Sequence, residues 1–528
     1  MKKFSIITLV LASALILGCS KNALVTEPSS STATATIFTD TETAALAVNG
    51  LNRVMYCQYN DYSQGFNGEG TIRLYHGDYM GHDLMVVNRT TYQNTQNGDY
   101  FDSNTATFAS YAWYYYYMLI GNANSIINNI DNVAGPEADR KFLKAQALCY
   151  RAYAYSNLVQ LFGRRWSDGP DKPACVLRLI AGGDDKLDRS TARQVYEQIY
   201  KDLDDAIQLF TESGKDRPAG EFYKMNLDVA HAIYARTALT REDWQKALDQ
   251  AKLARANYPL MSVADYKAGF CNPTSEWIWG LYNVTDETIY YYSFLGYIAY
   301  NSNAGNVRTT PKAISKHIFD QIAPTDIRRG LWLDPAGYES DMNAETNLAK
   351  AQKNTNALYN YGFAYASADG RVGLYSTAYV AGYMQFKFRC NEAPGNGHQP
   401  LFRSSEMLLI EAEANYQLNK PTDAQAALVE LNATSGRYPT YTCTKTGTAL
   451  MDEIKLYRSI ELWGEGFNWF DLKRWGDKLE RKAAVNGGNW MSSFAVTINP
   501  NEKNNWTWTI PKRETDYNKG ILSVSNID

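Results

Sequence analysis

The densest group of chemically capable side chains lies near the end of the 528-residue chain, in SIELWGEGFNWFDLKRWG, residues 459–476. It places the carboxylates of Glu461, Glu465 and Asp471 among three tryptophans. Carboxylates beside aromatic side chains suit a glycoside hydrolase, which needs one carboxylate on each side of the bond that it cleaves. This stretch therefore either carries out chemistry or holds the fold together.

The spacing favours a structural role. Glu461 and Glu465 lie one helical turn apart, and Asp471 and Arg474 follow closely. Carboxylates near an arginine are more often part of a partly buried ion-pair network than an acid and base pair. The sequence neither fixes nor excludes the carboxylate separation that hydrolysis needs. The tryptophans are expected to pack in the core and at its rim: Trp463, Trp469 and Trp475.

A second candidate is LYHGDYMGHDLM, residues 74–85, which carries His76, Asp78, His82 and Asp83. Imidazole and carboxylate groups can bind zinc or manganese. The spacing matches no recognised ligand pattern, so ordinary turn chemistry is the preferred interpretation. No metal and no cofactor is predicted.

Composition excludes some partners and leaves others open. The formal net charge is −4, and no basic cluster is interleaved with aromatics, which argues against a nucleic-acid partner. The cysteines after Cys19 are widely spaced without C-x-x-C, which argues against a zinc site or a small disulfide scaffold. The 39 tyrosines suggest a wet binding surface, although a tyrosine-rich core and rim would explain most of them.

The N-terminus reads as a targeting segment. Lys2 and Lys3 precede an uncharged run to Leu17, which suits the apolar core of a signal peptide. Gly18 before Cys19 is similar to the lipobox of bacterial lipoproteins, which implies cleavage after residues 1–18 and acylation of Cys19. The alternative is a plain secretory signal in which Cys19 has no role. Residues 19–36, rich in Ser, Thr and Ala, are predicted to be a flexible tether.

Helical periodicity dominates the rest of the chain and predicts a mostly α fold. Apolar residues recur at helical spacing in residues 142–163 and 191–210, and Thr191 with Gln194 forms a capping box. Residues 227–239 and 243–256 are predicted to form an antiparallel pair. Residues 402–418 and 419–432 form another pair, in which Pro421 begins the second helix and Thr422 with Gln425 forms a capping box. Such pairs resemble tetratricopeptide units.

Two large, loop-rich insertions interrupt this scaffold, at about 56–110 and 271–397. Their weak periodicity and many turn residues predict loops with a few short strands. One strand is predicted in EWIWGLYN, residues 276–283, where side chains alternate.

Several motifs in order now resemble one family. WYYYYMLIGNANSIINNI, LFRSSEMLLIEAEANYQL, YRSIELWGEGFNWFDLKRWG and WTWTIPKRETDYNKGI resemble successive segments of the SusD-like (SusD/RagB) outer-membrane nutrient-binding lipoproteins of the Bacteroidetes. The resemblance implies that residues 37–528 form one SusD-like domain. It also implies that the final signature packs onto the scaffold and is not catalytic; its residues are Glu461, Glu465, Gly466, Trp469, Asp471, Arg474 and Trp475.

The same resemblance implies a function without catalysis. The protein would be lipid-anchored at the outer membrane, facing the exterior, and would pass captured glycan to a TonB-dependent, SusC-like transporter. The alternatives are a peptide-binding member of the family, a polysaccharide-degrading enzyme and a purely structural repeat protein. The chain departs from the family where Tyr457 and Asn468 replace charged residues, so the ion pairs of the signature are expected to be rewired.

Ligand contacts are expected in the two insertions, because loops on a rigid scaffold usually carry recognition. Flat aromatic faces with polar neighbours suit sugars, although alternate tyrosines of IYYYSFLGYIAY would equally fill the inner face of a strand. The candidates are Asp78, Asp83, Arg89, Tyr92, Tyr100, Phe101, Asn104, Tyr290, Tyr291, Tyr292, Tyr297 and Tyr300.

We expect Cys19→Ala to abolish lipidation and to move the protein out of the membrane fraction, because one residue would carry the anchor. Fractionation of cells that express either form, followed by immunoblotting, measures this. An unchanged membrane share in the variant would rule out the lipoprotein assignment.

Overall fold

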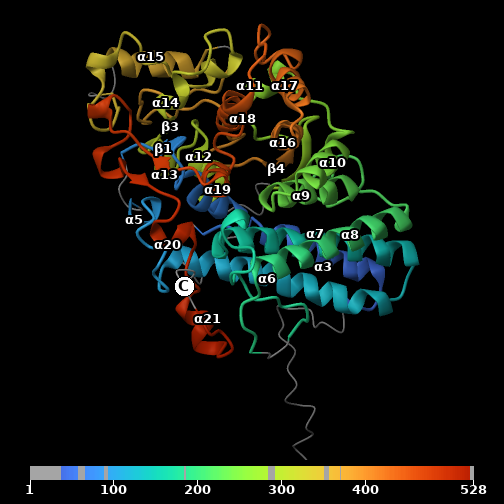
Figure 1. Ribbon diagram of the computed structural model, residues 1–528. Helices are drawn as coiled ribbons and strands as arrows, with labels where there is room; N and C mark the ends of the chain where they lie inside the picture. Colours follow the sequence, from blue (N-terminus) through green and yellow to red (C-terminus); the bar gives the residue numbers. More distant parts are fainter. Residues whose placement is uncertain are drawn as a thin grey trace, which may run out of the picture.

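The computed structural model describes residues 37–56, 66–88, 93–182, 186–283, 292–349, 356–368 and 370–523. Long helices dominate it, as the sequence predicts (Figure 1). Within these ranges, no helix combines the length and the apolar character needed to cross a bilayer. The predicted lipidation site Cys19, the predicted signal peptide and the predicted tether lie outside the described residues.

The scaffold is a succession of packed helices. Each of the following packs on its neighbours, and Figure 1 shows the first four side by side in one layer. They are α3 (Thr41–Val54), α6 (Thr107–Asn129), α7 (Glu137–Phe162), α8 (Ala192–Ser213), α9 (Leu227–Thr240), α10 (Trp244–Arg255), α16 (Ser404–Gln417), α17 (Pro421–Val429) and α18 (Gly447–Glu461). The predicted antiparallel pairs are therefore confirmed as α9 with α10 and α16 with α17. Alanines at 0% exposure along α7 let its neighbours approach closely.

One predicted helix start is confirmed and another is wrong. Gln194 N donates to Thr191 Oγ1 at 3.2 Å and Thr191 N donates to Gln194 Oε1 at 2.9 Å, which is the expected capping box of α8. In α17, Pro421 is the first helical residue as predicted, so the cap position falls on Lys420 and Thr422 is already inside the helix. The Gln425 side chain instead donates to Lys445 O.

Three two-stranded antiparallel sheets join distant segments. The pairs are β1 (Leu84–Val86) with β3 (Lys312–Ile314), β2 (Trp277–Leu281) with β4 (Gln399–Arg403), and β5 (Leu479–Glu480) with β6 (Thr497–Ile498). The predicted strand in residues 276–283 is confirmed as β2. Its pairing with β4 brings the two ends of the second insertion together, with Leu281 opposite Gln399. β4 then continues directly into α16.

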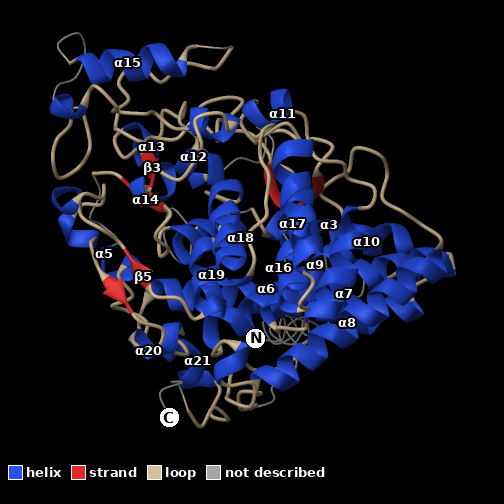
Figure 2. Cartoon of the chain, turned by 45° about the horizontal axis from the view of Figure 1, so that its top comes forward, coloured by secondary structure: helices blue, strands red, loops and turns tan. Residues whose placement is uncertain are grey.

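The second insertion contains short helices as well as loops (Figure 2). The clearest are α12 (Phe294–Ile298), α13 (Gly305–Arg308), α14 (Lys316–Phe319) and α15 (Ala357–Ala366). The alternative of one strand with alternating tyrosines is wrong for residues 294–298, because Ser293 Oγ accepts from Gly296 N and starts a helix there. The first three of these helices, with four or five residues each, are too short to leave a periodic pattern in the sequence.

Other short elements complete the chain. They are α4 (Glu69–Thr71), α5 (Gln93–Gln96), α11 (Val263–Lys267), α19 (Asn468–Trp475), α20 (Lys503–Trp506) and α21 (Lys512–Tyr517), the π-helices η2 (Ile72–Asp78) and η9 (Glu430–Thr434), and the 3₁₀ turns η3 (Ile130–Asn132), η4 (Trp166–Asp168), η7 (Ile327–Leu331), η8 (Glu339–Asp341), η10 (Ala484–Asn486) and η11 (Ser492–Phe494).

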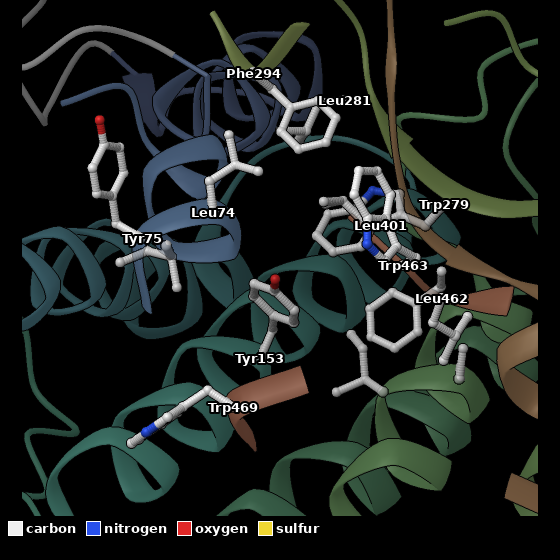
Figure 3. Close-up of a cluster of buried hydrophobic side chains, with 14 of the residues drawn as sticks. Leu74, Tyr75, Tyr153, Trp279, Leu281, Phe294, Leu401, Leu462, Trp463 and Trp469 are labelled. Carbon is white, nitrogen blue, oxygen red and sulfur yellow. The ribbon is translucent and has the colours of Figure 1, made fainter. Parts of the chain in front are cut away.

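One hydrophobic core connects the scaffold, the insertions and the signature stretch. Figure 3 shows Tyr153 of α7, Trp279 of β2 and Trp463 of the signature in one buried cluster. Trp463 and Trp469 are 2% and 1% exposed, and Trp475 is half-buried, as core and rim packing predicts. The Trp469 ring packs at 4.9 Å from Phe470 and at 5.9 Å from Phe101.

We expect Trp469→Ala to lower the free energy of unfolding by about 3–5 kcal/mol, the usual cost of removing a large buried aromatic side chain. Urea denaturation measures it. The half-buried Trp244 gives a matched control, since Trp244→Ala should cost much less. Equal losses in the two variants would contradict a core role for Trp469.

Candidate functional site

The carboxylates of the signature are bound by buried cations. Arg403 Nη1 donates to Glu461 Oε1 at 2.7 Å, and Arg403 Nε donates to Glu465 Oε2 at 2.8 Å. Lys387 Nζ donates to Glu465 Oε1 at 2.7 Å. These four side chains are at most 4% exposed. The ion-pair interpretation of the signature is thus confirmed, and burial is more complete than expected.

The network extends to further residues that sequence reasoning missed. Glu276, immediately before β2, accepts from Arg403 and Arg437, while Arg328 joins Asp326 to Glu461. Four carboxylates therefore face four cations, which balances the buried charge. In the sequence, the sign of these partners is a charged residue next to an apolar run, such as Lys387 in MQFKFRC and Glu276 before WIWGL. A charge in such a position predicts a buried ion pair.

The cations keep Glu461 ionised. Burial is the largest influence and acts to raise the pKa of Glu461, but Arg437, Arg403, Arg328 and Lys387 together hold it well below its usual range. The pKa of Glu465 is also lowered, because Arg403 and Lys387 overcome its burial. A general acid needs a proton to give near neutral pH, so neither carboxyl suits that role.

A separate network holds the end of the signature. Arg458 binds Asp471 through Nε and Nη2, at 2.9 and 3.0 Å. Arg474 bridges Asp471 and Glu413, and the half-buried Trp475 donates its indole N–H to the same Glu413. The signature thus anchors α19 on α18 and α16.

Asp78 and Asp83 of the first insertion lie beneath the signature. Asp78 Oδ2 accepts from Gly466 N at 2.7 Å, and Asp83 Oδ2 accepts from Asn468 Nδ2 at 2.6 Å. Burial, the larger influence on each, raises the pKa of Asp78 to about 8 and that of Asp83 to about 7. Asn468 Oδ1 also accepts from His82 N at 2.6 Å. At Asn468, where the sequence analysis expected an altered ion pair, the neutral amide donates to the carboxyl of Asp83, whose pKa is raised.

Two glycines allow this close packing. A Cβ on Gly77 would lie 2.4 Å from Gly466 O, and a Cβ on Gly466 would lie 2.7 Å from the Arg73 side chain. Gly466 also has φ near +90°, which disfavours other residues. The histidines of this segment contact other groups: His76 Nε2 lies 3.1 Å from Phe108 O, and Glu480 N donates to His82 Nδ1. Among the described residues, no three His, Cys, Asp or Glu side chains gather as a metal site would require.

The other predicted ligand residues are scattered. Phe101, Tyr297 and Tyr300 are at most 5% exposed and Tyr292 is half-buried, whereas Tyr100 is 41% exposed. Asn104 is half-buried, and its backbone carbonyl accepts from Lys512 N. As ligand contacts, all of them stay predictions. Four more lie outside the described residues: Arg89, Tyr92, Tyr290 and Tyr291.

An aromatic surface lies where the second insertion leaves and rejoins the scaffold. Tyr282, 39% exposed, stacks on His398 with ring centroids 4.9 Å apart and planes 19° apart. Tyr223 and Phe222 pack beside Tyr282 at 5.0 and 6.3 Å. His398 Nδ1 accepts from Asn283 N at 3.1 Å, and burial lowers the pKa of His398, so the neutral ring carries its proton on Nε2. Sequence reasoning missed these residues.

Two unsatisfied amides flank the same strand ends. Asn283 and Gln399 are 8% and 5% exposed, and within the described part of the chain neither Asn283 Oδ1 nor Gln399 Nε2 has a hydrogen-bond partner. Both line a cavity of about 10 Å³, room for one water-sized group. Because side chains alternate along a strand, this cavity and the Tyr282 ring lie on opposite sides of the chain. The two amides are therefore not part of the aromatic surface.

Comparison with known families covers nearly the whole chain. Residues 244–524, more than half of its length, match the SusD family. Residues 61–239 match a family described as starch-binding associating with outer membrane.

Individual proteins agree with the family matches. SusD-like protein P38 of Formosa agariphila is 23% identical, over 92% of this chain and 95% of that protein. A SusD-like carbohydrate binding protein from Bacteroides vulgatus superposes with a TM-score of 0.73 at 23% identity, over 92% of this chain and 98% of that one. Surface glycan-binding protein A from Bacteroides thetaiotaomicron gives 0.65 at 18% identity, over 93% and 100%. Likeness at these identities establishes the helical fold.

The raised pKa of Asp78 predicts a pH dependence of stability. Its folded pKa of about 8 lies above the unfolded value of about 4, so its contribution to stability is lost as the pH rises between these values. We expect the free energy of unfolding to fall more from pH 6 to pH 9 in the wild type than in Asp78→Asn. The amide cannot ionise but can still accept from Gly466 N.

Urea denaturation at several pH values measures both profiles. Asp102→Asn, at an exposed position of the same insertion, serves as the control and should follow the wild type. Parallel profiles for the wild type and Asp78→Asn would show that the Asp78 carboxyl does not titrate in this range.

Proposed function

This chain belongs to the SusD family, and from that premise we propose that it is a non-catalytic lipoprotein of the outer membrane that captures oligo- or polysaccharide. It hands this glycan to a TonB-dependent, SusC-like transporter. In this proposal residues 1–18 are the signal peptide, Cys19 carries the lipid, residues 19–36 form the tether, and residues 37–528 form the binding domain, which faces the cell exterior.

The aromatic surface formed by Tyr282 and His398 is the observation that carries the proposal. A sugar ring has apolar C–H faces between its hydroxyl groups, so a flat exposed aromatic can stack on it while polar groups bind its hydroxyls. Tyr282 supplies such a face, and the half-buried His398 ring beside it supplies an N–H donor. Carbohydrate is favoured over peptide because two structures with this fold are described as carbohydrate- and glycan-binding proteins.

Binding without cleavage is supported by the state of the signature carboxylates. Glu461 and Glu465 are buried, ionised and saturated by cations, so they lack both the proton and the access to solvent that a hydrolase needs. Their role is to hold the signature against β4.

We expect the purified protein to bind at least one polysaccharide without releasing products, and Tyr282→Ala to weaken that binding about tenfold, as loss of a stacked ring predicts. A glycan array finds the ligand, titration calorimetry measures affinity, and chromatography detects products. Tyr375, 42% exposed in the same insertion, is the matched control, and Tyr375→Ala should bind as the wild type does.

Other outcomes would change the proposal. Product release that disappears in Glu465→Gln would make the protein an enzyme. Binding of peptides and of no glycan would place it among peptide importers. Unchanged affinity in Tyr282→Ala for a confirmed glycan would move the site toward the predicted loop residues, including those outside the described ranges.

A further inference from the structure

A narrow cleft lined by arginines separates the π-helix η2 from the scaffold. It lies away from Tyr282, between η2, α7, α9, α18 and the signature turn. Asn157, Gln160 and Phe470 are half-buried at its edge. Four guanidinium groups and two carboxylates line it: Arg73, Arg236, Arg458 and Arg474 with Glu69 and Asp471.

Two of these arginines have donors that nothing accepts. Arg73 donates through Nη1 to Glu465 O and through Nη2 to Leu401 O, but its Nε has no hydrogen-bond partner in the described chain. Arg458 uses Nε and Nη2 on Asp471, and its Nη1 is likewise unpartnered. Their side chains are 6% and 2% exposed. A buried donor without an acceptor is destabilising, so an acceptor in the cleft would stabilise the fold.

Positive charge gathers around one ring of the cleft. The guanidinium carbons of Arg73, Arg236 and Arg458 lie 5.8, 5.0 and 5.8 Å from the centroid of the Phe467 ring. Glu406, which pairs with Arg236, does not line the cleft. Glu413, which pairs with Arg474, also lies outside the lining, so the unpartnered donors of Arg73 and Arg458 are what the cleft offers to an anion.

The one carboxylate next to Arg73 is already occupied. Glu69 accepts from the hydroxyls of Tyr115, Tyr116 and Tyr153, and its Oε1 remains 3.8 Å from Arg73 Nε. Burial raises the pKa of Glu69, although Arg73 opposes this. At that distance Glu69 leaves the Arg73 Nε donor without a hydrogen bond.

We propose that this cleft binds one small inorganic anion of chloride size, which accepts from Arg73 Nε and Arg458 Nη1. Its free volume of about 40 Å³ admits a few water-sized particles and no sugar ring. The anion links η2 of the first insertion to α18 of the scaffold. This site is independent of glycan binding, and its occupancy should stabilise the fold through mass action.

Crystals grown without chloride and soaked in sodium bromide test the site directly in the wild-type protein. We expect an anomalous bromide peak between Arg73 and Arg458. In solution, chloride should raise the melting temperature more than gluconate at the same ionic strength, because gluconate is too large for the cleft. A cleft without bromide, or equal effects of chloride and gluconate, would overturn the proposal and leave only water there.

A charge placed at the edge of the cleft gives a second test. Asn157→Asp should weaken the affinity for chloride about tenfold, because a carboxylate near the anion repels it. The affinity is obtained from the rise of the melting temperature with chloride concentration. Asn129→Asp is the matched control, since both asparagines are half-buried and donate to the backbone carbonyl four residues earlier. The control should keep the wild-type chloride response. Equal chloride responses in the two variants would also overturn the proposal.

Discussion

The fold depends most on the guanidinium of Arg403. This group sits at the end of β4 and binds Glu276, which immediately precedes β2, together with Glu461 and Glu465 of the signature. Removing one partner from a buried ion pair costs about 3–5 kcal/mol, because the remaining charge has no compensation. Apolar packing can tolerate small shifts between helices, but a balanced set of buried charges requires that all its members meet. Arg403 therefore fixes how the strand pair meets the final helices.

That constraint also positions the proposed glycan surface. Leu281 pairs with Gln399, which lies four residues before Arg403 in β4. Tyr282 directly follows Leu281, and His398 directly precedes Gln399. A strand pair whose far end is locked by charge holds its near end in one geometry. Ligand binding there loses less conformational entropy than it would on an unsupported loop.

Sequence periodicity predicted the long helices, because their apolar faces repeat over several turns, as in α7 and α8. Periodicity did not reveal α12, because five residues are too few to show a repeated apolar face. It also did not reveal the partners of Glu461, because they lie far from Glu461 in the chain and no residue spacing connects them to it. The aromatic surface was missed for a related reason. Tyr282 and His398 come together only through the β2–β4 pairing, whereas the sequence drew attention to tyrosines that are close in the chain.

The second insertion contributes Arg328 and Lys387 to the buried charges under the signature. The insertion therefore cannot be exchanged independently of the signature that it binds. A recombination event that exchanged the whole segment would remove Glu276 and Asp326 together with these two cations, so the incoming segment would have to restore four charged groups in the same places. Ligand choice should therefore change through substitutions in the loops between these buried charged residues. The charged residues themselves should be inherited together.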